Sequence, residues 1–187
     1  MSEAPLAAIL AGGAGRRLGG AKPAALLAGR PLISYPIGAA RAAGLEVVVV
    51  AKRRSALPPL DCELLLEPDE PLHPLLGVVT ALRRAPAVLA IACDMPFVTA
   101  AVLELLARTP PPAAAAAGGL LQPLLAAYSA RDLPVLEQAL AASAPATATL
   151  ARLGTAAVPI DHLGDPQRLC ANVNVPAELA AAERLLG

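Results

Sequence analysis

The segment LAAILAGGAGRRLGGAK, residues 6–22, decides the fold because it joins a short apolar run directly to a glycine-rich, basic loop. A short apolar run that ends in glycine is typical of a buried strand. Glycine lets the backbone approach a ligand closely, and successive amide N–H groups in such a loop form an anion-binding concavity. Arg16, Arg17 and Lys22 add positive charge that suits phosphate. The segment therefore predicts a phosphate cradle at the carboxyl end of a strand.

This loop differs from the two commonest nucleotide-binding loops. A Walker loop has Lys and then Ser or Thr directly after its last glycine, whereas Ala21 follows Gly20 here. The dinucleotide pattern G-x-G-x-x-G fails because Leu18 stands where the third glycine belongs. On this motif alone, a basic surface loop without a ligand stays open as the alternative.

The composition favours one domain with an aliphatic core. The chain has 187 residues, of which 56% are hydrophobic and only 2% aromatic, so Ala, Leu and Val must form the core. A formal net charge of +0 gives no bulk attraction to nucleic acid or anionic membrane. Three widely spaced cysteines without a C-x-x-C pair argue against a disulfide framework or a zinc site. We therefore expect a soluble cytoplasmic protein with no nucleic-acid or membrane partner.

Apolar runs alternate with helical segments along the chain. Strands are expected at residues 5–11, 45–51, 62–66, 87–93 and 155–160, with a hairpin of 113–117 and 120–121 around Gly118-Gly119 and a further run at 125–128. Helices are expected at 31–43, with a kink at Pro36, and at 100–107, 131–142, 147–153 and 177–186. A further helix is expected after the loop of residues 67–74 and ends at about residue 84. This alternation predicts an α/β fold, a single three-layer α/β/α domain over residues 1–187 with a mostly parallel, Rossmann-like sheet.

Polar or flexible residues follow each of the first expected strands. The glycine loop follows the first strand, and Lys52, Asp69 and Asp94 follow the next ones in turn. Ligands bind beyond the carboxyl ends of the strands in sheets of this kind. We therefore expect these residues to converge along one edge of the sheet.

Asp94 is the sharpest candidate for chemistry, because it ends a seven-residue apolar run and Pro96 stiffens the turn after it. A carboxylate that faces a basic phosphate loop suits Mg²⁺, which proteins usually hold with one or two carboxylates plus substrate phosphates. Lys22 would stabilise charge on the transferring phosphate. The alternatives are a helix cap or an ion pair for Asp94 and a solvated surface position for Lys22.

Several weaker candidates also have a purely structural interpretation. Asp69 would bind a ribose hydroxyl or a base edge, or would only belong to an acidic, proline-bounded loop. Asn172 and Asn174 alternate along one face before the last helix, so both amides would point into the cleft unless they merely form a helix-entry turn. The cysteines are expected in the core and His162 at the surface, and the role of His73 is open.

The ordered motifs resemble those of the nucleotidyltransferases. The matching stretches are Leu10-Ala11-Gly12-Gly13…Arg17-Leu18-Gly19…Lys22 for L-A-G-G-x-x-x-R-M-G-x-x-K, Gly29-Arg30-Pro31-Leu32 for G-K-P-L, Glu67-Pro68-Asp69-Glu70…Pro74-Leu75-Leu76-Gly77 for D…G-P-L-A-G, Asp94-Met95-Pro96-Phe97 for D-x-P-F, Gln122-Pro123-Leu124…Tyr128 for H-P-L-x-x-x-Y, and Asn172-Val173-Asn174-Val175-Pro176…Glu178-Leu179 for N-I-N-T-P-E-D-L. This set spans nearly the whole chain. It is most similar to that of the molybdenum cofactor guanylyltransferases, within the MobA-like NTP transferase family.

The resemblance implies a nucleotidyltransferase sheet and an enzyme that transfers GMP from GTP to molybdopterin, releases pyrophosphate and uses Mg²⁺. It implies a nucleotide site made of Leu10, Ala11, Gly12, Gly13, Lys22, Lys52, Asp69 and Asp94, with Asp94 also as the metal ligand. Its catalytic residues would be Lys22, Asp94 and Arg17, and its acceptor-facing residues Gln122, Asn172 and Asn174. GTP and molybdopterin are then the expected partners, with transient contacts to molybdoenzyme proteins that deliver or accept the cofactor.

The chain departs from the family pattern at Gly15 in place of serine, Lys52 in place of asparagine, His73 in place of glycine and Val175 in place of threonine. The changes at Lys52 and His73 concern the base and pterin contacts, not the phosphate chemistry.

Three alternatives remain open: a cytidylyltransferase for the same cofactor, a sugar-phosphate or cobinamide-phosphate nucleotidyltransferase, and a regulatory GTP-binding module without turnover. Gly12-Gly13 and Asp94-Met95-Pro96 favour GTP, because cytidylyl relatives tend to carry Ala-Gly and Asp-Gln-Pro there. The oligomeric state and the exact form of the acceptor are also open.

Overall fold

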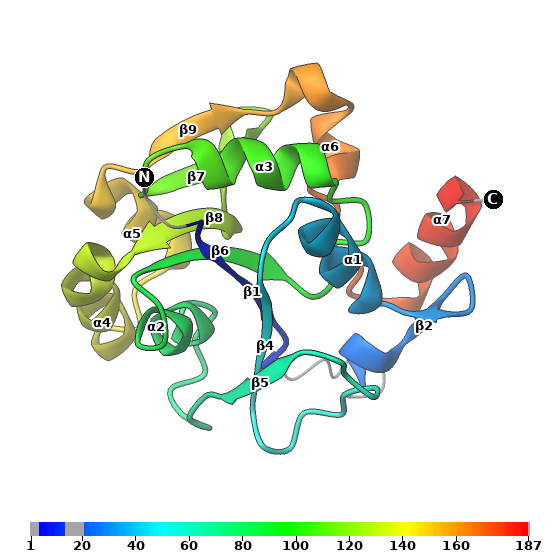
Figure 1. Cartoon of the computed structure of the whole chain (residues 1–187), viewed down its shortest axis with the longest axis horizontal. Helices are drawn as coiled ribbons and strands as arrows, with labels where there is room; N and C mark the ends of the chain where they lie inside the picture. Colours follow the sequence, from blue (N-terminus) through cyan, green and yellow to red (C-terminus); the bar gives the residue numbers. More distant parts are fainter. Residues whose placement is uncertain (1–3, 14–20, 187) are drawn as a thin grey trace.

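The computed structural model describes residues 4–13 and 21–186, and a seven-stranded sheet lies at its centre (Figure 1). The strands lie in the order β5-β4-β1-β6-β8-β7-β9. Their bounds are Leu6–Leu10 (β1), Val47–Ala51 (β4), Glu63–Leu66 (β5), Ala87–Ala92 (β6), Ala113–Ala117 (β7), Leu120–Ser129 (β8) and Ala156–Pro159 (β9). A separate two-stranded hairpin consists of β2 (Leu26–Leu27) and β3 (Arg30–Pro31).

The four strands from β5 to β6 are parallel, whereas β8 runs antiparallel to both β6 and β7. The last strand, β9, is again parallel to β7. Every residue of β4 is buried, as a strand covered on both faces requires. The prediction of a mostly parallel sheet is therefore confirmed.

Helices cover both faces of this sheet. Their bounds in the described residues are Ser34–Ala42 (α1), Leu76–Leu82 (α2), Ala100–Arg108 (α3), Leu133–Ala141 (α4), Ala146–Leu153 (α5), Pro166–Leu169 (α6) and Pro176–Leu186 (α7). On one face, Ile37 of α1 and Leu103 of α3 belong to the same apolar cluster as Ile9 of β1. On the other face, Val78 of α2 and Leu136 of α4 lie in a second cluster. The three-layer α/β/α arrangement is therefore confirmed.

Prolines explain where the observed elements differ from the predicted ones. The helix α1 begins at Ser34 because Pro31 pairs with Leu26 in the hairpin. Pro36 is the third residue of α1, where a backbone N–H would have no intrahelical partner, so the expected kink is not required. β8 runs unbroken through Pro123, which lies between Leu121 and Ala126, where the β7–β8 register is irregular. Proline is tolerated at such irregular positions of a sheet. The short helix α6 was not expected from the sequence.

The order of strands along the chain reverses at β1, because β4 and β5 follow on one side of it and β6 on the other. Such a reversal leaves a crevice at the carboxyl ends of the strands, where ligands bind. The C-terminal segment returns to this edge, since the Val173 N–H donates to the Asp94 carbonyl oxygen at 2.9 Å. The fold therefore brings the start, the middle and the end of the chain to one place.

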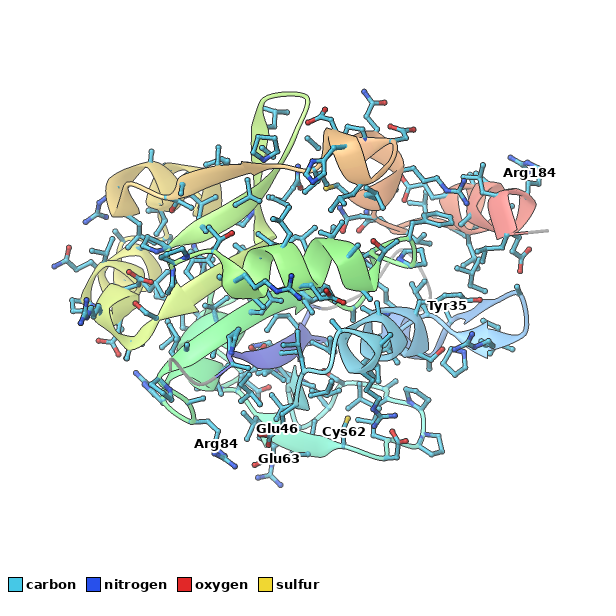
Figure 2. The ribbon with its side chains drawn as sticks, turned by 45° about the horizontal axis from the view of Figure 1, so that its top comes forward. Tyr35, Glu46, Cys62, Glu63, Arg84 and Arg184 are labelled. Carbon is cyan, nitrogen blue, oxygen red and sulfur yellow. The ribbon has the colours of Figure 1, made fainter. Side chains whose placement is uncertain are left out.

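α7 and the edge strand β5 lie in different parts of the molecule (Figure 1). α7 lies beside the β2 hairpin at one end (Figure 1). At the β5 edge, Glu63 and Arg84 form an exposed ion pair at 3.3 Å, far from Arg184 on α7 (Figure 2). Within the described ranges, no helix combines the length and the apolar character that a bilayer crossing needs.

Candidate active site

A cavity of about 570 Å³ lies at the carboxyl edge of the parallel strands. This volume falls in the range typical of small-molecule sites. Its lining includes residues that follow β1, β4, β5 and β6, together with residues from the C-terminal segment, among them Gly12, Lys52, Glu67, Asp94 and Asn174. The cavity is therefore built by the convergence that the parallel strands predict.

Asp94 lies at one end of the cavity, where the buried strand β6 ends. The Cys93 N–H donates to the Leu10 carbonyl oxygen at 3.1 Å, which extends the β1–β6 ladder up to the residue before Asp94. Asp94 is only 7% exposed, and its Oδ2 accepts a hydrogen bond from Lys22 Nζ. Gly12, Gly13 and Asp94 thus line one cavity, as expected for residues that follow neighbouring parallel strands.

Lys22 bridges Asp94 and Asn174. Its Nζ donates to Asn174 Oδ1 at 2.6 Å in addition to its bond to Asp94. Lys22 is the first residue of a 3₁₀ turn, η2 (Lys22–Ala24). The Asn174 N–H donates to Glu178 Oε2 at 2.6 Å, at the start of α7. A carboxylate oxygen and an amide oxygen therefore converge on a single cationic atom, and both are hard ligands of the kind that magnesium prefers.

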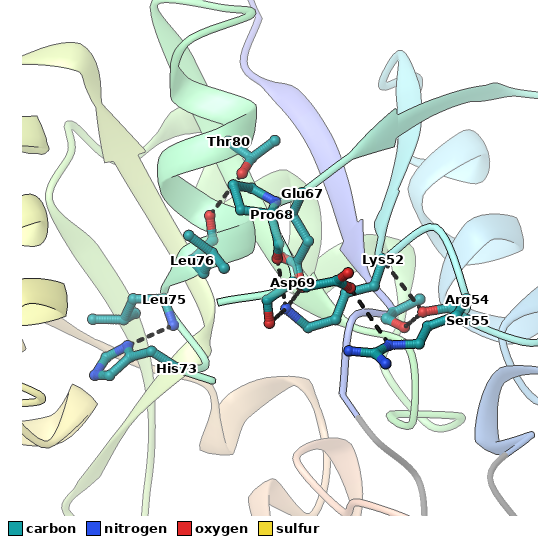
Figure 3. Close-up of polar contacts among 11 residues, drawn as sticks. Lys52, Arg54, Ser55, Glu67, Pro68, Asp69, His73, Leu75, Leu76 and Thr80 are labelled. Carbon is teal, nitrogen blue, oxygen red and sulfur yellow. Dashed lines mark hydrogen bonds and ion pairs between the residues drawn. The ribbon is translucent and has the colours of Figure 1, made fainter. Parts of the chain in front are cut away.

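A second ion pair, between Lys52 and Glu67, lines the cavity on its other side (Figure 3). Lys52 Nζ lies 3.4 Å from Glu67 Oε1, and the two side chains are 9% and 7% exposed. Lys52 Nζ also donates to the carbonyl oxygens of Pro68 at 2.7 Å and Asp69 at 2.9 Å. Burial raises the pKa of the Glu67 carboxyl above its ordinary range, and the nearby Lys52 ammonium opposes part of that rise.

Two glycines make room for the Glu67 carboxylate. A Cβ atom on Gly12 would lie 1.7 Å from Glu67 Oε1, and one on Gly77 would lie 3.0 Å from Glu67 Oε2 and 2.9 Å from Leu10 Cδ2. Around Gly13, by contrast, nothing described lies within 4 Å of such an atom. Glycine at position 12 is therefore explained by the close approach of the Glu67 side chain to its Cα atom.

His73 ties the loop before α2 to the segment between α4 and α5, on the same face of the sheet. The Leu75 N–H donates to His73 Nδ1 at 3.1 Å, so the proton of the neutral ring lies on Nε2. This Nε2 donates to the Ala144 carbonyl oxygen at 2.7 Å, between α4 and α5. The position that the sequence left open is thus a tether for the loop after β5.

Two predicted nucleotide-binding residues, Asp69 and Ala11, accept hydrogen bonds near the cavity through their backbone carbonyl oxygens. The Asp69 carbonyl binds Lys52, but its side chain is 54% exposed and pairs with Arg54 at 3.5 Å. Ala11 is buried, and its carbonyl oxygen accepts from Ser55 Oγ at 3.3 Å. Neither side chain lines the cavity.

The remaining predicted residues fall into three groups. Leu10 and Asn172 line the cavity, and Asn172 Nδ2 donates to the Cys170 carbonyl oxygen at 3.2 Å. Gln122 is outside the lining and lies two residues before Leu124, which does line it. Arg17 lies outside the described residues, so its role stays a prediction.

Residues 7–159 match the family model of the MobA-like NTP transferase domain. The chain belongs to this family. The matched range includes β1 except its first residue, together with Lys52, Glu67 and Asp94. It ends before Asn174, which the C-terminal segment adds to the cavity.

Relatives of this MobA-like NTP transferase cover most of its length. The molybdenum cofactor guanylyltransferase of Pseudomonas putida is 35% identical over 144 residues, which are 72% of this chain and 75% of the relative. The probable molybdenum cofactor guanylyltransferase of Thermococcus kodakarensis is 33% identical over 142 residues, 71% of this chain and 70% of the relative. The crystal structure of molybdopterin-guanine dinucleotide biosynthesis protein A from Archaeoglobus fulgidus superposes with a TM-score of 0.80 at 26% identity, covering 96% of this chain and 97% of that one.

Glu67 received no role from the sequence. Asp69 and Glu70 stand beside it and offer the same charge, so composition alone does not separate them. Glu67 is, however, the first residue after β5, as Lys52 is the first after β4. The rule that placed Lys52 and Asp94 at the carboxyl edge could therefore have found it.

Proposed function

We propose that this protein transfers GMP from GTP to molybdopterin and releases pyrophosphate. The observation that carries the proposal is the cavity that Gly12, Gly13, Lys22 and Asp94 share at the carboxyl edge of the sheet. The names of the two curated relatives support both the guanine nucleotide and the molybdenum cofactor as substrates. We further propose that residues 1–187 act as one nucleotidyltransferase domain.

In this proposal the triphosphate lies between the backbone after β1 and the Lys22 side chain. A terminal phosphate oxygen of molybdopterin attacks the α-phosphorus of GTP, a new P–O bond forms, and the bond to the bridging oxygen of the β-phosphate breaks. Pyrophosphate leaves with that oxygen and its electron pair. The Lys22 ammonium, already directed into the site by Asp94 and Asn174, stabilises negative charge as it develops.

Nucleotidyltransferases of this kind typically use a divalent metal ion. In the described part of the chain, no cluster of three or more His, Cys, Asp or Glu side chains is arranged around a metal position. Mg²⁺ needs only one or two carboxylates when substrate phosphates complete its shell. The Asp94 and Asn174 oxygens, which already share one cation, fit that requirement. Mg²⁺ held by Asp94 would neutralise phosphate charge.

The acceptor is proposed to enter beside Asn172 and Asn174, which line the cavity from the C-terminal segment. Gln122 is kept in this proposal as an outer contact, because it precedes Leu124 on the same strand. A cytoplasmic location is also proposed, supported by three cysteines that are all free thiols, as in reducing compartments.

The test is pyrophosphate release with GTP or CTP, each with and without molybdopterin. We expect release with GTP only when molybdopterin is present. Faster release with CTP would identify a cytidylyltransferase. GTP binding without release in the presence of molybdopterin would identify a binding module and overturn the proposed function.

A further inference from the structure

Building on the proposed function, we propose that Ser55 is a positioning residue. Its hydroxyl group holds the backbone after β1 so that the Gly12 N–H points to the triphosphate. Ser55 is half-buried and lies outside the lining of the cavity, so it acts through the backbone that it binds.

The Ser55 hydroxyl group takes the place of one ladder bond between β1 and β4. The Ala11 N–H donates to the Val50 carbonyl oxygen at 2.8 Å, as the parallel register of these strands requires. In the same register, the next bond would join the Lys52 N–H to the Ala11 carbonyl oxygen. Instead, the Lys52 N–H donates to Ser55 Oγ at 3.2 Å (Figure 3), and Ser55 Oγ donates to the Ala11 carbonyl oxygen at 3.3 Å. Ser55 thus bridges the two strand ends.

A tight turn brings the Ser55 hydroxyl group to this place. The Ser55 N–H donates to the Lys52 carbonyl oxygen at 3.0 Å, which closes a turn directly after β4. Ser55 therefore binds both backbone groups of Lys52, the carbonyl oxygen through its N–H and the N–H through its hydroxyl oxygen. Because the turn is fixed in this way, the hydroxyl proton is directed to Ala11 before any ligand arrives.

The bond to Ala11 sets the direction of the Gly12 N–H. The peptide bond between Ala11 and Gly12 is trans, so its C=O and N–H groups point in opposite directions. The carbonyl points to Ser55 on the β4 side of β1, and the Gly12 N–H therefore points to the β6 side, where Asp94 follows the strand. Gly12 and Asp94 line the same cavity. A backbone N–H directed there donates a charge-assisted hydrogen bond to a phosphate oxygen.

A hydroxyl group suits this position because it accepts one hydrogen bond and donates another. Alanine at position 55 would remove the partner of the Ala11 carbonyl oxygen and of the Lys52 N–H. The peptide before Gly12 would then rotate more freely, since two consecutive glycines restrict the backbone very little. Ordering the peptide when a phosphate binds would cost free energy that the Ser55 bond saves in the wild type.

The test measures the dissociation constant of GTP by calorimetry and that of guanosine, which has no phosphate group, by NMR titration. Ser55→Ala should weaken GTP binding roughly 3- to 10-fold, the effect of one hydrogen bond, and leave guanosine binding unchanged. The loss is confined to the phosphates because the Lys52 side chain keeps its bonds to the carbonyl oxygens of Pro68 and Asp69 in this variant.

Two further variants separate positioning from a general effect on the fold. Ser55→Thr retains the hydroxyl group and should bind GTP as the wild type does. Ser34→Ala is the matched control, because the Ser34 hydroxyl also donates to a backbone carbonyl, that of Pro31 at 2.6 Å, but lies outside the cavity lining. This control should keep the wild-type affinity for GTP.

Wild-type affinity for GTP in Ser55→Ala would overturn the inference, and so would an equal loss for GTP and guanosine or an equal loss in Ser55→Thr. The wild type gives a second reading that needs no folded variant, because the Gly12 amide resonance should move when inorganic pyrophosphate binds. A Gly12 resonance that stays in place while that of Asp94 moves would also overturn the inference. In each of these cases, pyrophosphate release by the wild type from GTP and molybdopterin would still uphold the proposed function.

Discussion

Lys22 and Asp94 lie 72 positions apart in the chain yet form an ion pair at the carboxyl edge of the sheet. Pairing between β1 and β6 brings the segments that carry them together, and the C-terminal segment adds Asn174 to the same cation. The ion pair is thus a product of the parallel sheet, and it marks the end of the cavity where phosphate chemistry is proposed.

Replacing Asp94 with Ala should lower Mg²⁺-dependent turnover by about 10²-fold or more, the usual effect of removing one electrostatic stabiliser. The fold should persist, because Asp94 is anchored through backbone bonds of its neighbours. Steady-state pyrophosphate release measures the effect, and Asp161→Ala, an exposed aspartate, is the control. Wild-type turnover in Asp94→Ala would remove Asp94 from the mechanism.

Replacing Lys22 with Met should weaken GTP binding and slow pyrophosphate release while the protein stays folded. The methionine keeps the apolar stem but removes the charge shared by Asp94 and Asn174. Calorimetry with GTP and thermal unfolding, run on the same preparation, separate the two effects. Loss of the folded state with no change in the affinity of the remaining folded protein would show that Lys22 is structural.

Gly12→Ala should weaken GTP binding, because the new methyl group would displace the Glu67 carboxylate that lines the cavity. Its Cβ would occupy the position of Glu67 Oε1, and the flexible end of that side chain would move away. The control is Gly38→Ala on the exposed face of α1, where nothing lies within 4 Å of a new Cβ and stability should rise by about 0.5–1 kcal/mol. An affinity for GTP as in the wild type would show that the Glu67 carboxylate does not need its present position.

The stability of the protein should carry a pH dependence from Glu67. Burial raises the pKa of this carboxyl above its ordinary value of 4.5, so the folded state binds the proton more tightly than the unfolded state does. Its stabilising contribution is therefore present at low pH and is lost as the pH rises through the folded pKa. The free energy of unfolding in urea, measured below and above pH 4.5, should fall with rising pH in the wild type relative to Glu67→Gln. A difference in unfolding free energy between the two proteins that does not change with pH would contradict a raised pKa of Glu67.

The parts of the fold that depend on uninterrupted apolar runs were predictable. β4 and β6 are such runs, and once both are parallel neighbours of β1, Lys52 and Asp94 must emerge at one edge. Periodicity alone did not predict the unbroken β8, because tolerance of Pro123 depends on a register irregularity with β7.

The detailed contacts of the site could not be predicted in the same way. Asn174 reaches Lys22 across 152 positions, through a return of the chain that no local pattern encodes. The choice of Glu67 over Asp69 as the buried acid depends on the turn after β5 and on the carbonyl groups that hold Lys52. Such contacts are set by tertiary packing, whereas the position of a residue after a strand can be read from sequence.

The most direct test of the central claim is a crystal structure of the protein with GTP and Mn²⁺, with the metal located by anomalous scattering. We expect the triphosphate between Lys22 and the backbone after β1, and the metal on the Asp94 carboxylate. A triphosphate bound outside this cavity, or a metal ion away from Asp94, would contradict the account.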